Sequence, residues 1–302
     1  MPHSIRFQVL ILPNTDAKKQ LERFKYVETL GFDVAATADH FVDWTNPPSD
    51  WLEAWTLLGA VARETSCIRL TSCVSQIPLR HPAMFARQAL TVDHLSSGRL
   101  DVGIGIGINI DPSYDMMGIP NWTAKQRVDR FKEYICIVDS LLSNEVTDYH
   151  GDYYKIAGAY MNPRPLQQPR PPMLIAAMGP VMISIAAKHA DTWNSLSFEP
   201  SFDTQFIQTR QRIEHMRQCC EKLGRDPNSL RISYQMFDTN ARNSGGKFNY
   251  YASEQLFIDM VSRFAELGVS EFGVYFPMSG DQLPMFEQIA RDTIPTLRKH
   301  LS

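Results

Sequence analysis

The residues best suited to acid–base chemistry follow the second short apolar run of the chain. Asp39 and His40 come directly after residues 34–37. A histidine exchanges protons near neutral pH, and a neighbouring carboxylate can fix its tautomer or bind a ligand donor. The structural alternative is an aspartate at a helix start followed by a surface histidine. A position at a strand end favours function, so His40 is the candidate catalytic residue, and Trp44 offers an aromatic wall nearby.

A second polar group ends the next apolar run, at Ser72 and Cys73. Serine hydroxyls and main-chain groups there could hydrogen-bond a planar heterocycle. A polar strand end that only caps the following helix explains the residues equally well. Cys73 has no adjacent histidine, which argues against a catalytic thiol.

Glycine alternates in Gly103-Ile104-Gly105-Ile106-Gly107. This spacing differs from a dinucleotide fingerprint, and no strand-to-helix turn follows it directly. Glycines at such a strand end would let a flat ligand lie against the backbone.

Met178, Gly179 and Pro180 follow another apolar run and open a helical segment. Glycine before a proline in the first helical turn leaves N–H groups at a positive helix end, which suits a phosphate. A purely structural helix start needs the same residues, so the two interpretations are balanced.

Elements that could position these groups alternate along the chain as short β-branched runs and longer amphipathic segments. Eight such pairs predict a single (β/α)₈ TIM barrel domain over residues 1–302, with insertions at the C-terminal face. A doubly wound sheet would need a glycine-rich turn after its first strand, which is absent here. The predicted strands are 5–12, 34–37, 68–74, 100–106, 173–177, 192–196, 232–237 and 272–276, and the helices are 16–30, 51–65, 82–95, 123–142, 181–188, 203–223, 253–267 and 282–300.

Glycines mark several predicted joins from helix to strand, at Gly31, Gly98 and Gly268. Three connections are longer than plain loops: 107–122 after strand four, 143–172 before strand five, and 239–251 after strand seven. Aromatic residues in these loops suggest an apolar or aromatic substrate. They are Tyr114, Trp122, Phe248, Tyr250 and Tyr251.

Composition narrows the class of protein. Thirty Lys and Arg against 33 Asp and Glu give a net charge of −3, which attracts neither nucleic acid nor an anionic membrane. No apolar run approaches the roughly 20 residues of a membrane span, and no signal peptide is visible. Five cysteines without C-x-x-C spacing argue against a zinc site or disulfide framework. We therefore expect a cytoplasmic protein without a metal.

The combination of separated blocks resembles the luciferase-like family of flavin and deazaflavin enzymes. The blocks span residues 31–41, 68–74, 80–83 with 95–100, 103–107, 162–172 and 190–194. The Arg-His-Pro-Ala block at 80–83 and the Ser-x-Gly-Arg block ending at Arg99 are specific when taken together. The resemblance covers about residues 5 to 200, and the last third only by the order of its elements.

This resemblance implies that FMN or the deazaflavin coenzyme F-420 binds at the barrel mouth. Asp39 and His40 match the family's pair on strand two, with His40 as proton donor or acceptor. The family's non-prolyl cis peptide would fall at Cys73–Val74, and Gly179 matches the cofactor-phosphate loop. Cofactor contacts are then expected at Asp39, Ser72, Cys73, Val74, Gly105, Gly107, Asn109, Met178, Gly179 and Pro180.

Two positions depart from the family pattern. Ile108 stands where F-420-dependent sugar-phosphate dehydrogenases carry a glutamate, which argues against glucose 6-phosphate and places Ile108 with Trp44 in the substrate pocket. Met178 stands where relatives commonly have another glycine. Asn109 and Asp111 are polar and nearby, and could replace the lost contacts.

The leading hypothesis is an oxidoreductase that transfers hydride between F-420 and a small organic substrate. The alternative is a two-component monooxygenase that uses O₂ and FMN reduced by a separate reductase. A non-catalytic flavin-binding barrel is a weaker hypothesis, and a hydrolase is weaker again because no nucleophile–base pair is visible. The family resemblance also implies a homodimer.

Overall fold

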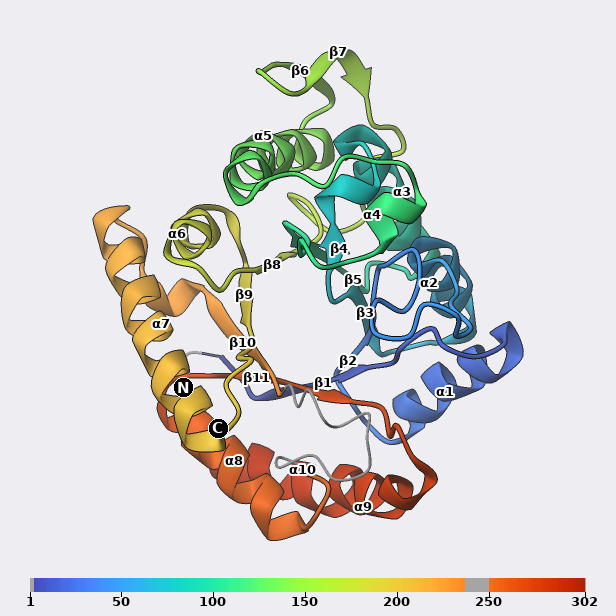
Figure 1. Ribbon diagram of the computed structural model, residues 1–302, viewed down its shortest axis with the longest axis vertical. Coiled ribbons are helices and arrows are strands. Elements are labelled where there is room, and N and C mark those ends of the chain that lie inside the picture. Colours follow the sequence, from blue (N-terminus) through green and yellow to red (C-terminus); the bar gives the residue numbers. More distant parts are fainter. Residues whose placement is uncertain (1–2, 237–249, 302) are drawn as a thin grey trace. The chain divides into compact units, whose positions relative to one another are not determined.

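The structure is a computed structural model that describes residues 3–236 and 250–301 (Figure 1). The chain groups into two compact units. The first contains Met1–Ile11, Tyr26–Ala35 and Ala177–Ser302, and the second contains Leu12–Lys25 and Ala36–Ala176. The predicted loop 239–251 lies almost wholly outside the described residues, as do Phe237 and Phe248.

The described residues contain eight parallel strands, each followed by a helix, when β3 and β4 count as one interrupted strand. This is the (β/α)₈ barrel class, so the predicted fold is confirmed. The bounds are β1 (Arg6–Leu10), β2 (Val34–Thr37), β3 (Arg69–Ser72), β4 (Ser75–Gln76), β5 (Leu100–Gly105), β8 (Met173–Ala176), β9 (Thr192–Ser195), β10 (Arg231–Gln235) and β11 (Glu271–Tyr275).

The helices also lie close to their predicted ranges. They are α1 (Ala17–Thr29), α2 (Ala54–Glu64), α3 (Pro82–Leu95), α4 (Ser113–Met116), α5 (Ala124–Ser143), α6 (Pro180–His189), α7 (Phe202–Lys222), α8 (Glu254–Glu266), α9 (Leu283–Gln288) and α10 (Ile294–Leu301), with 3₁₀ turns η1 (Ile77–Leu79), η2 (Pro227–Ser229) and η3 (Gly280–Gln282). In the described ranges no helix is long and apolar enough to cross a membrane.

The last predicted helix, 282–300, is not continuous. A π-helical turn, η4 (Ile289–Thr293), separates α9 from α10. The wider turn places Ile289 and Ile294, five positions apart, on the same buried side. Apolar periodicity alone does not distinguish this turn from a regular helix.

In the first unit, β1 pairs with β11, and β10 pairs with both β9 and β11. Aromatic side chains of these strands pack on one another and on a helix. Phe7 stacks on Phe272 with ring centroids 5.6 Å apart and on Phe257 of α8 at 6.2 Å. Burying such rings supplies most of the driving force for closing these layers.

In the second unit, β5 is the central strand and pairs with β3, β4 and β8. Figure 1 shows α2, α3 and α5 on the outer side of these strands. Trp55 of α2 and Tyr134 of α5 both contact the fully buried ring of Phe85 in α3, at 5.2 and 5.8 Å. This aromatic group holds the three helices together behind the strands.

A β-hairpin in the connection 143–172 is absent from the sequence-based prediction. Its strands are β6 (Val146–His150) and β7 (Lys155–Tyr160). The carboxylate of Glu133 in α5 accepts hydrogen bonds from the main-chain N–H groups of Asp152, Tyr153 and Tyr154 in the turn. A side chain from the preceding helix, α5, therefore shapes the turn, and no pattern within the hairpin itself reveals it.

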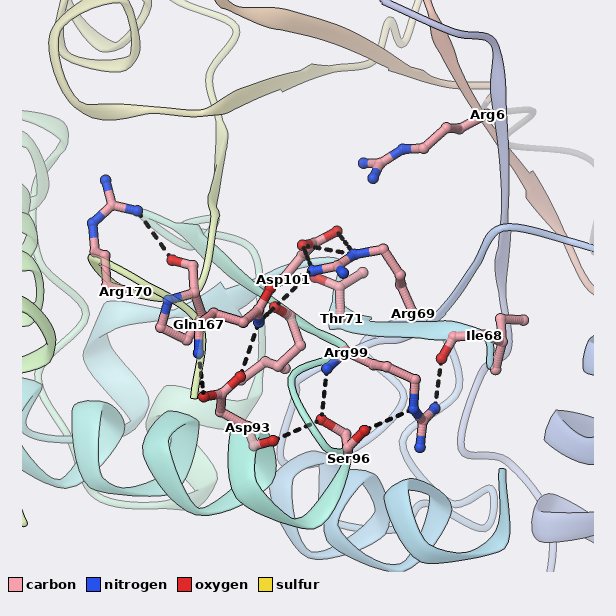
Figure 2. A network of polar contacts seen from close by, with 12 residues as sticks. Arg6, Ile68, Arg69, Thr71, Asp93, Ser96, Arg99, Asp101, Gln167 and Arg170 are labelled. Carbon is pink, nitrogen blue, oxygen red and sulfur yellow. Dashed lines mark hydrogen bonds and ion pairs between the residues drawn. The ribbon is translucent and has the colours of Figure 1, made fainter. Parts of the chain in front are cut away.

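The block Ser96–Arg99 joins α3 to β5 through a network of polar contacts (Figure 2). Gly98 has φ +82° and its N–H donates to Asp93 O, so the predicted glycine cap is confirmed. Arg99 then donates to the carbonyls of Ala62 at 2.8 Å and Thr65 at 2.9 Å in the last turn of α2. It also donates to Ile68 O and Ser96 O.

Asp93 and Gln167 extend this network to the proline-rich segment that precedes β8 (Figure 2). Gln167 Nε2 donates to Asp93 Oδ1 at 2.9 Å and to Leu100 O at 2.6 Å. Its Oε1 accepts from Arg69, which also binds Asp101. These contacts lie at the amino ends of β3 and β5, where barrel residues serve stability.

We expect Arg99→Ala to lower the free energy of unfolding by about 3 kcal/mol. The substitution removes a charged donor and leaves several carbonyl oxygens without hydrogen-bond partners. Urea unfolding should show a lower midpoint with an unchanged slope. Arg63→Ala is the matched control, since exposed Arg63 makes one long bond, 3.4 Å, to Leu95 O. Equal losses in the two variants would contradict this account.

Candidate active site

The third barrel strand is interrupted near the candidate site. β3 ends at Ser72 and β4 begins at Ser75, and the Cys73–Val74 peptide between them is cis, as the family resemblance predicts. Cys73 and Val74 are half-exposed. A Cβ on Gly105 of β5 would lie 2.6 Å from Val74 Cγ2, so the absence of a side chain at Gly105 lets Val74 pack there.

His40 follows β2 and pairs with a carboxylate far along the chain. Its Nδ1 lies 2.6 Å from Asp111 Oδ2. The His40 side chain is 16% exposed, whereas the Asp111 side chain is fully buried. Asp111 Oδ1 accepts a hydrogen bond from the N–H of Ser113 at 2.9 Å, and Oδ2 accepts one from Gln76 Nε2 at 2.8 Å. The turn after β5 thus carries a carboxylate to the histidine.

Burial would raise the pKa of Asp111, but hydrogen bonds from His40, Gln76 and Ser113 outweigh it and hold the pKa well below its usual range. Because the carboxylate is ionised, the short contact to Nδ1 requires a proton on that nitrogen. Neutral His40 therefore carries its lone pair on Nε2. Among the described residues, no hydrogen bond engages Nε2.

Of the two roles that the sequence leaves open for Asp39, orienting His40 is not the one observed, because the Asp39 carboxylate binds Arg80 instead. Both Asp39 oxygens bind the guanidinium of Arg80, with Nη2 lying 3.0 Å from Oδ1. Arg80 also binds Glu53, which caps α2. Burial lowers the pKa of Arg80, but the Asp39 charge more than offsets this and raises it. Asp39 is 2% exposed and ties the end of β2 to the starts of two helices.

The aromatic residue that contacts His40 is Trp51 rather than Trp44. Trp51 Nε1 donates to His40 O at 2.9 Å, and the two rings meet edge to face at 6.0 Å. Trp44 is half-buried, and Phe41, three residues before it, is exposed. Ile108 is half-exposed and Asn109 is exposed, with the Asn109 carbonyl held by Asn121.

Two polar side chains behind the pair, Gln76 and Arg127, are missing from the sequence analysis, and a third, Tyr114, appears there only as a loop aromatic. Gln76 Oε1 accepts a hydrogen bond from the hydroxyl of Tyr114, and Arg127 Nη1 lies 3.4 Å from the same hydroxyl. All three are buried. They come from β4, α4 and α5, so spacing along the chain gives no signal for them. Tyr114 is fully buried, which corrects its assignment to a substrate-facing loop.

The remaining loop aromatics also have structural partners. Trp122 stacks under Arg130, with the guanidinium carbon 4.3 Å from the ring centroid. Tyr250 and Tyr251 are buried and contact each other. These contacts account for the three rings without a role in binding a substrate.

The glycine block and Ser72 mainly serve packing within the second unit. Ser72 Oγ donates to Gly103 O at 2.9 Å, and a Cβ on Gly103 would overlap the Ser72 carbonyl. Gly107 has φ +76°, and a Cβ there would overlap the Tyr114 hydroxyl. The glycines thus allow close approach of protein groups.

In the first unit, Gly179 is the N-cap residue of α6 and Pro180 opens the helix. Gly179 is exposed, provides no side-chain cap, and has nothing within 4 Å of the position of a Cβ. Met178 before it is half-exposed. The first turn of α6 is therefore open to an anion such as a phosphate.

Within residues 3–236 and 250–301, no three His, Cys, Asp or Glu side chains gather where they could hold a metal ion.

A (β/α)₈ barrel with an acid–base pair at the carboxyl end of its second strand has the layout of an enzyme. The chain belongs to the luciferase-like monooxygenase family, whose model matches residues 3–243. This is a family of oxidoreductases, so the resemblance found in the sequence is confirmed.

Similar proteins include enzymes with different cofactors. Pyrimidine monooxygenase RutA of Klebsiella pneumoniae is 29% identical over 204 residues, covering 66% of this chain and 54% of the relative. The chain thus spans about half the length of this relative. The coenzyme F-420-dependent tetrahydromethanopterin reductase of Methanopyrus kandleri has a TM-score of 0.79 at 17% identity, covering 97% of this chain and 99% of that one. Riboflavin lyase, solved with a modified FMN, has a TM-score of 0.78 at 13% identity and covers 99% and 92%.

We expect Asp111→Asn to remove an acid-sensitive part of the stability. The pKa of folded Asp111 is below the unfolded value of about 3.9, so its contribution is present above that value and lost as the pH falls toward the folded pKa. Wild type should unfold at a higher urea concentration than the variant at about pH 7. The difference between the two midpoints should be smaller at about pH 3.5.

Asp115→Asn is the control for this measurement, because Asp115 is exposed in the same short helix, α4. Its midpoint should follow wild type at both pH values. A gap for Asp111→Asn that stays constant with pH would contradict the assignment of Asp111 as a stabilised carboxylate.

Proposed function

We propose that this protein transfers hydride between coenzyme F-420 and a small organic substrate, with His40 handling the substrate proton. The observation that carries the proposal is the orientation of His40. Asp111 holds Nδ1, at 2.6 Å, and the opposite nitrogen of a partly exposed ring has no partner among the described residues. A histidine held in this way is suited to general acid–base work.

Bound F-420 supplies hydride chemistry, and the protein supplies orientation and proton transfer. In the oxidation of an alcohol, His40 Nε2 would accept the hydroxyl proton, and bound coenzyme would take up the hydride from the carbinol carbon. Ionised Asp111 stabilises the imidazolium that forms. In the reverse direction, His40 returns the proton to the carbonyl oxygen as the carbon receives hydride.

The residues at the ends of β3 and β5 fit a flat ring. Cys73 and Val74 are half-exposed, Gly105 ends the adjacent strand β5, and Gly107 and Asn109 follow that strand. We assign the ring contacts to these residues together with Ser72 and Asp39. Trp44 and Ile108 are assigned to the substrate side.

The open first turn of α6 fits the phosphate of such a cofactor. Met178, Gly179 and Pro180 are the residues assigned to it, because the helix start is exposed and lacks a side-chain cap.

The second candidate is a two-component FMN monooxygenase, and the similarity to a pyrimidine monooxygenase favours it. Reduced FMN from a separate reductase would supply the two electrons that reduce one atom of O₂ to water while the other enters the substrate. His40 would again manage a proton at Nε2. The proposed partners are then a small substrate, the reductase and a second copy of the chain in a homodimer.

Fluorescence titration of the purified protein with F-420 and with FMN distinguishes the two candidates. We expect micromolar binding of F-420, with FMN at least tenfold weaker, a difference of about 1.4 kcal/mol. The reverse preference would support the monooxygenase, and O₂ consumption with chemically reduced FMN would then be measured. Absence of binding by both would contradict both candidates.

We expect His40→Ala to lower kcat by about 10²- to 10⁴-fold, because general acid–base catalysis is lost. The Kd for the cofactor should change by less than about tenfold, since His40 acts on the substrate. Exposed His150 in β6 offers the control variant His150→Ala, which should match wild type. Full turnover by His40→Ala would remove this mechanism.

A further inference from the structure

We propose that Tyr114 is a positioning residue for His40, acting through the amide of Gln76. The inference rests on the proposed function of His40 as the proton-handling group. Tyr114 does not touch His40, and its hydroxyl lies in a buried chain that runs from Arg127 through Tyr114 and Gln76 to Asp111.

Arg127 fixes the direction of this chain. Its guanidinium donates to the carbonyls of Ile106 and Trp122, both at 3.0 Å, and to Asn121 Oδ1 at 2.6 Å. It also lies over the Tyr114 ring, with its guanidinium carbon 4.8 Å from the centroid. Because a guanidinium only donates hydrogen bonds, the Tyr114 hydroxyl must accept from it. That hydroxyl then has its single proton left to donate, and it donates to Gln76 Oε1.

The Tyr114 bond in turn fixes the Gln76 amide. With Oε1 held by the hydroxyl, Nε2 lies 3.1 Å from Asp39 O, 2.8 Å from Asp111 Oδ2 and 2.8 Å from His40 Nδ1. The two amide protons go to the two oxygen acceptors, because His40 Nδ1 already carries the proton that it donates to Asp111. The opposite orientation would place Oε1 against an ionised carboxylate and a carbonyl, which is repulsive.

The backbone accommodates the Tyr114 hydroxyl specifically. Gly107 adopts φ +76°, and a Cβ there would overlap the hydroxyl and lie 2.7 Å from Gln76 Oε1. Tyr114 is 0% exposed, so bulk water does not replace its hydroxyl. The backbone at Gly107 and the surrounding side chains therefore leave space for the Tyr114 hydroxyl and hold it in place.

The consequence reaches His40 through Asp111. Gln76 donates a hydrogen bond to the same carboxylate oxygen that accepts one from His40 Nδ1. Without that donor, the carboxylate attracts the imidazolium more strongly. Other charged groups near this end of β2 are Asp39 and Arg80, paired with each other, Glu53, paired with Arg80, and buried Asp43, which accepts hydrogen bonds from Thr45. Arg127 lies behind Tyr114.

Tyr114→Phe tests the proposal, because it removes the hydroxyl and keeps the ring. Nitrogen-15 NMR of the histidine rings reports tautomer and pKa in the protein without cofactor, and His40→Gln identifies the His40 signals. Wild type should show neutral His40 protonated on Nδ1. In Tyr114→Phe, we expect the His40 pKa to rise by about 0.5 to 1 unit and the Nδ1 preference to weaken. The pH profile of kcat/KM should shift in the same direction.

Tyr234→Phe is the matched control. Tyr234 is also a buried tyrosine whose hydroxyl donates to a glutamine Oε1, that of Gln205 at 3.0 Å, but it belongs to the first unit. It should leave the His40 signals unchanged. Gln76→Met removes the amide that links Tyr114 to Asp111, and it should raise the His40 pKa as well. This second variant keeps the test informative if Tyr114→Phe fails to fold.

A folded Tyr114→Phe or Gln76→Met with wild-type His40 tautomer and pKa would overturn the proposal. So would wild-type His40 protonated on Nε2 in its neutral form. Failure of the proposed function is a separate result, because it appears as absent turnover in wild type while the NMR comparison remains informative.

Discussion

A buried carboxylate constrains the architecture around His40. The Asp111 side chain has no exposed surface, and an ionised carboxylate in such a place requires donors on its oxygens. It finds them on His40, Gln76 and Ser113, which come from the end of β2, from β4 and from α4. The segment after β5 must therefore fold back over the ends of two other strands. The hydrogen bonds on the Asp111 carboxylate thus fix the end of β2, β4 and α4 relative to one another.

The interruption of the third barrel strand makes this alignment feasible. β4 resumes at Ser75 and pairs with β5 so that Gln76 lies opposite Gly105. Ser75 Oγ donates to Ser72 Oγ and accepts from Trp55 Nε1 of α2, which joins the two parts of the strand from behind. A side chain from β4 can then reach Asp111 while Cys73 and Val74 remain half-exposed. One short segment thus contributes both to the packing of the barrel strand and to the hydrogen bonds on Asp111.

Local patterns were sufficient to predict the strands and most of the helices, because apolar periodicity and glycine joins are properties of neighbouring residues. They also identified His40 by its place at a strand end. Proximity in sequence made Asp39 one possible partner of His40, but Arg80 binds that carboxylate. The actual partner lies 71 residues away. Gln76 and Tyr114 have no local signature, since only tertiary packing brings them together.

The alternating glycines show why the ring surface and the acid–base pair are linked. Gly103 accommodates the Ser72 carbonyl, Gly105 accommodates Val74, and Gly107 accommodates the Tyr114 hydroxyl. A side chain at any of these glycines would displace the interrupted strand or the polar chain behind it. Displacing the strand would move Gln76 and the half-exposed residues together. The three glycines therefore tie the position of the interrupted strand to the position of the polar chain that ends at Asp111.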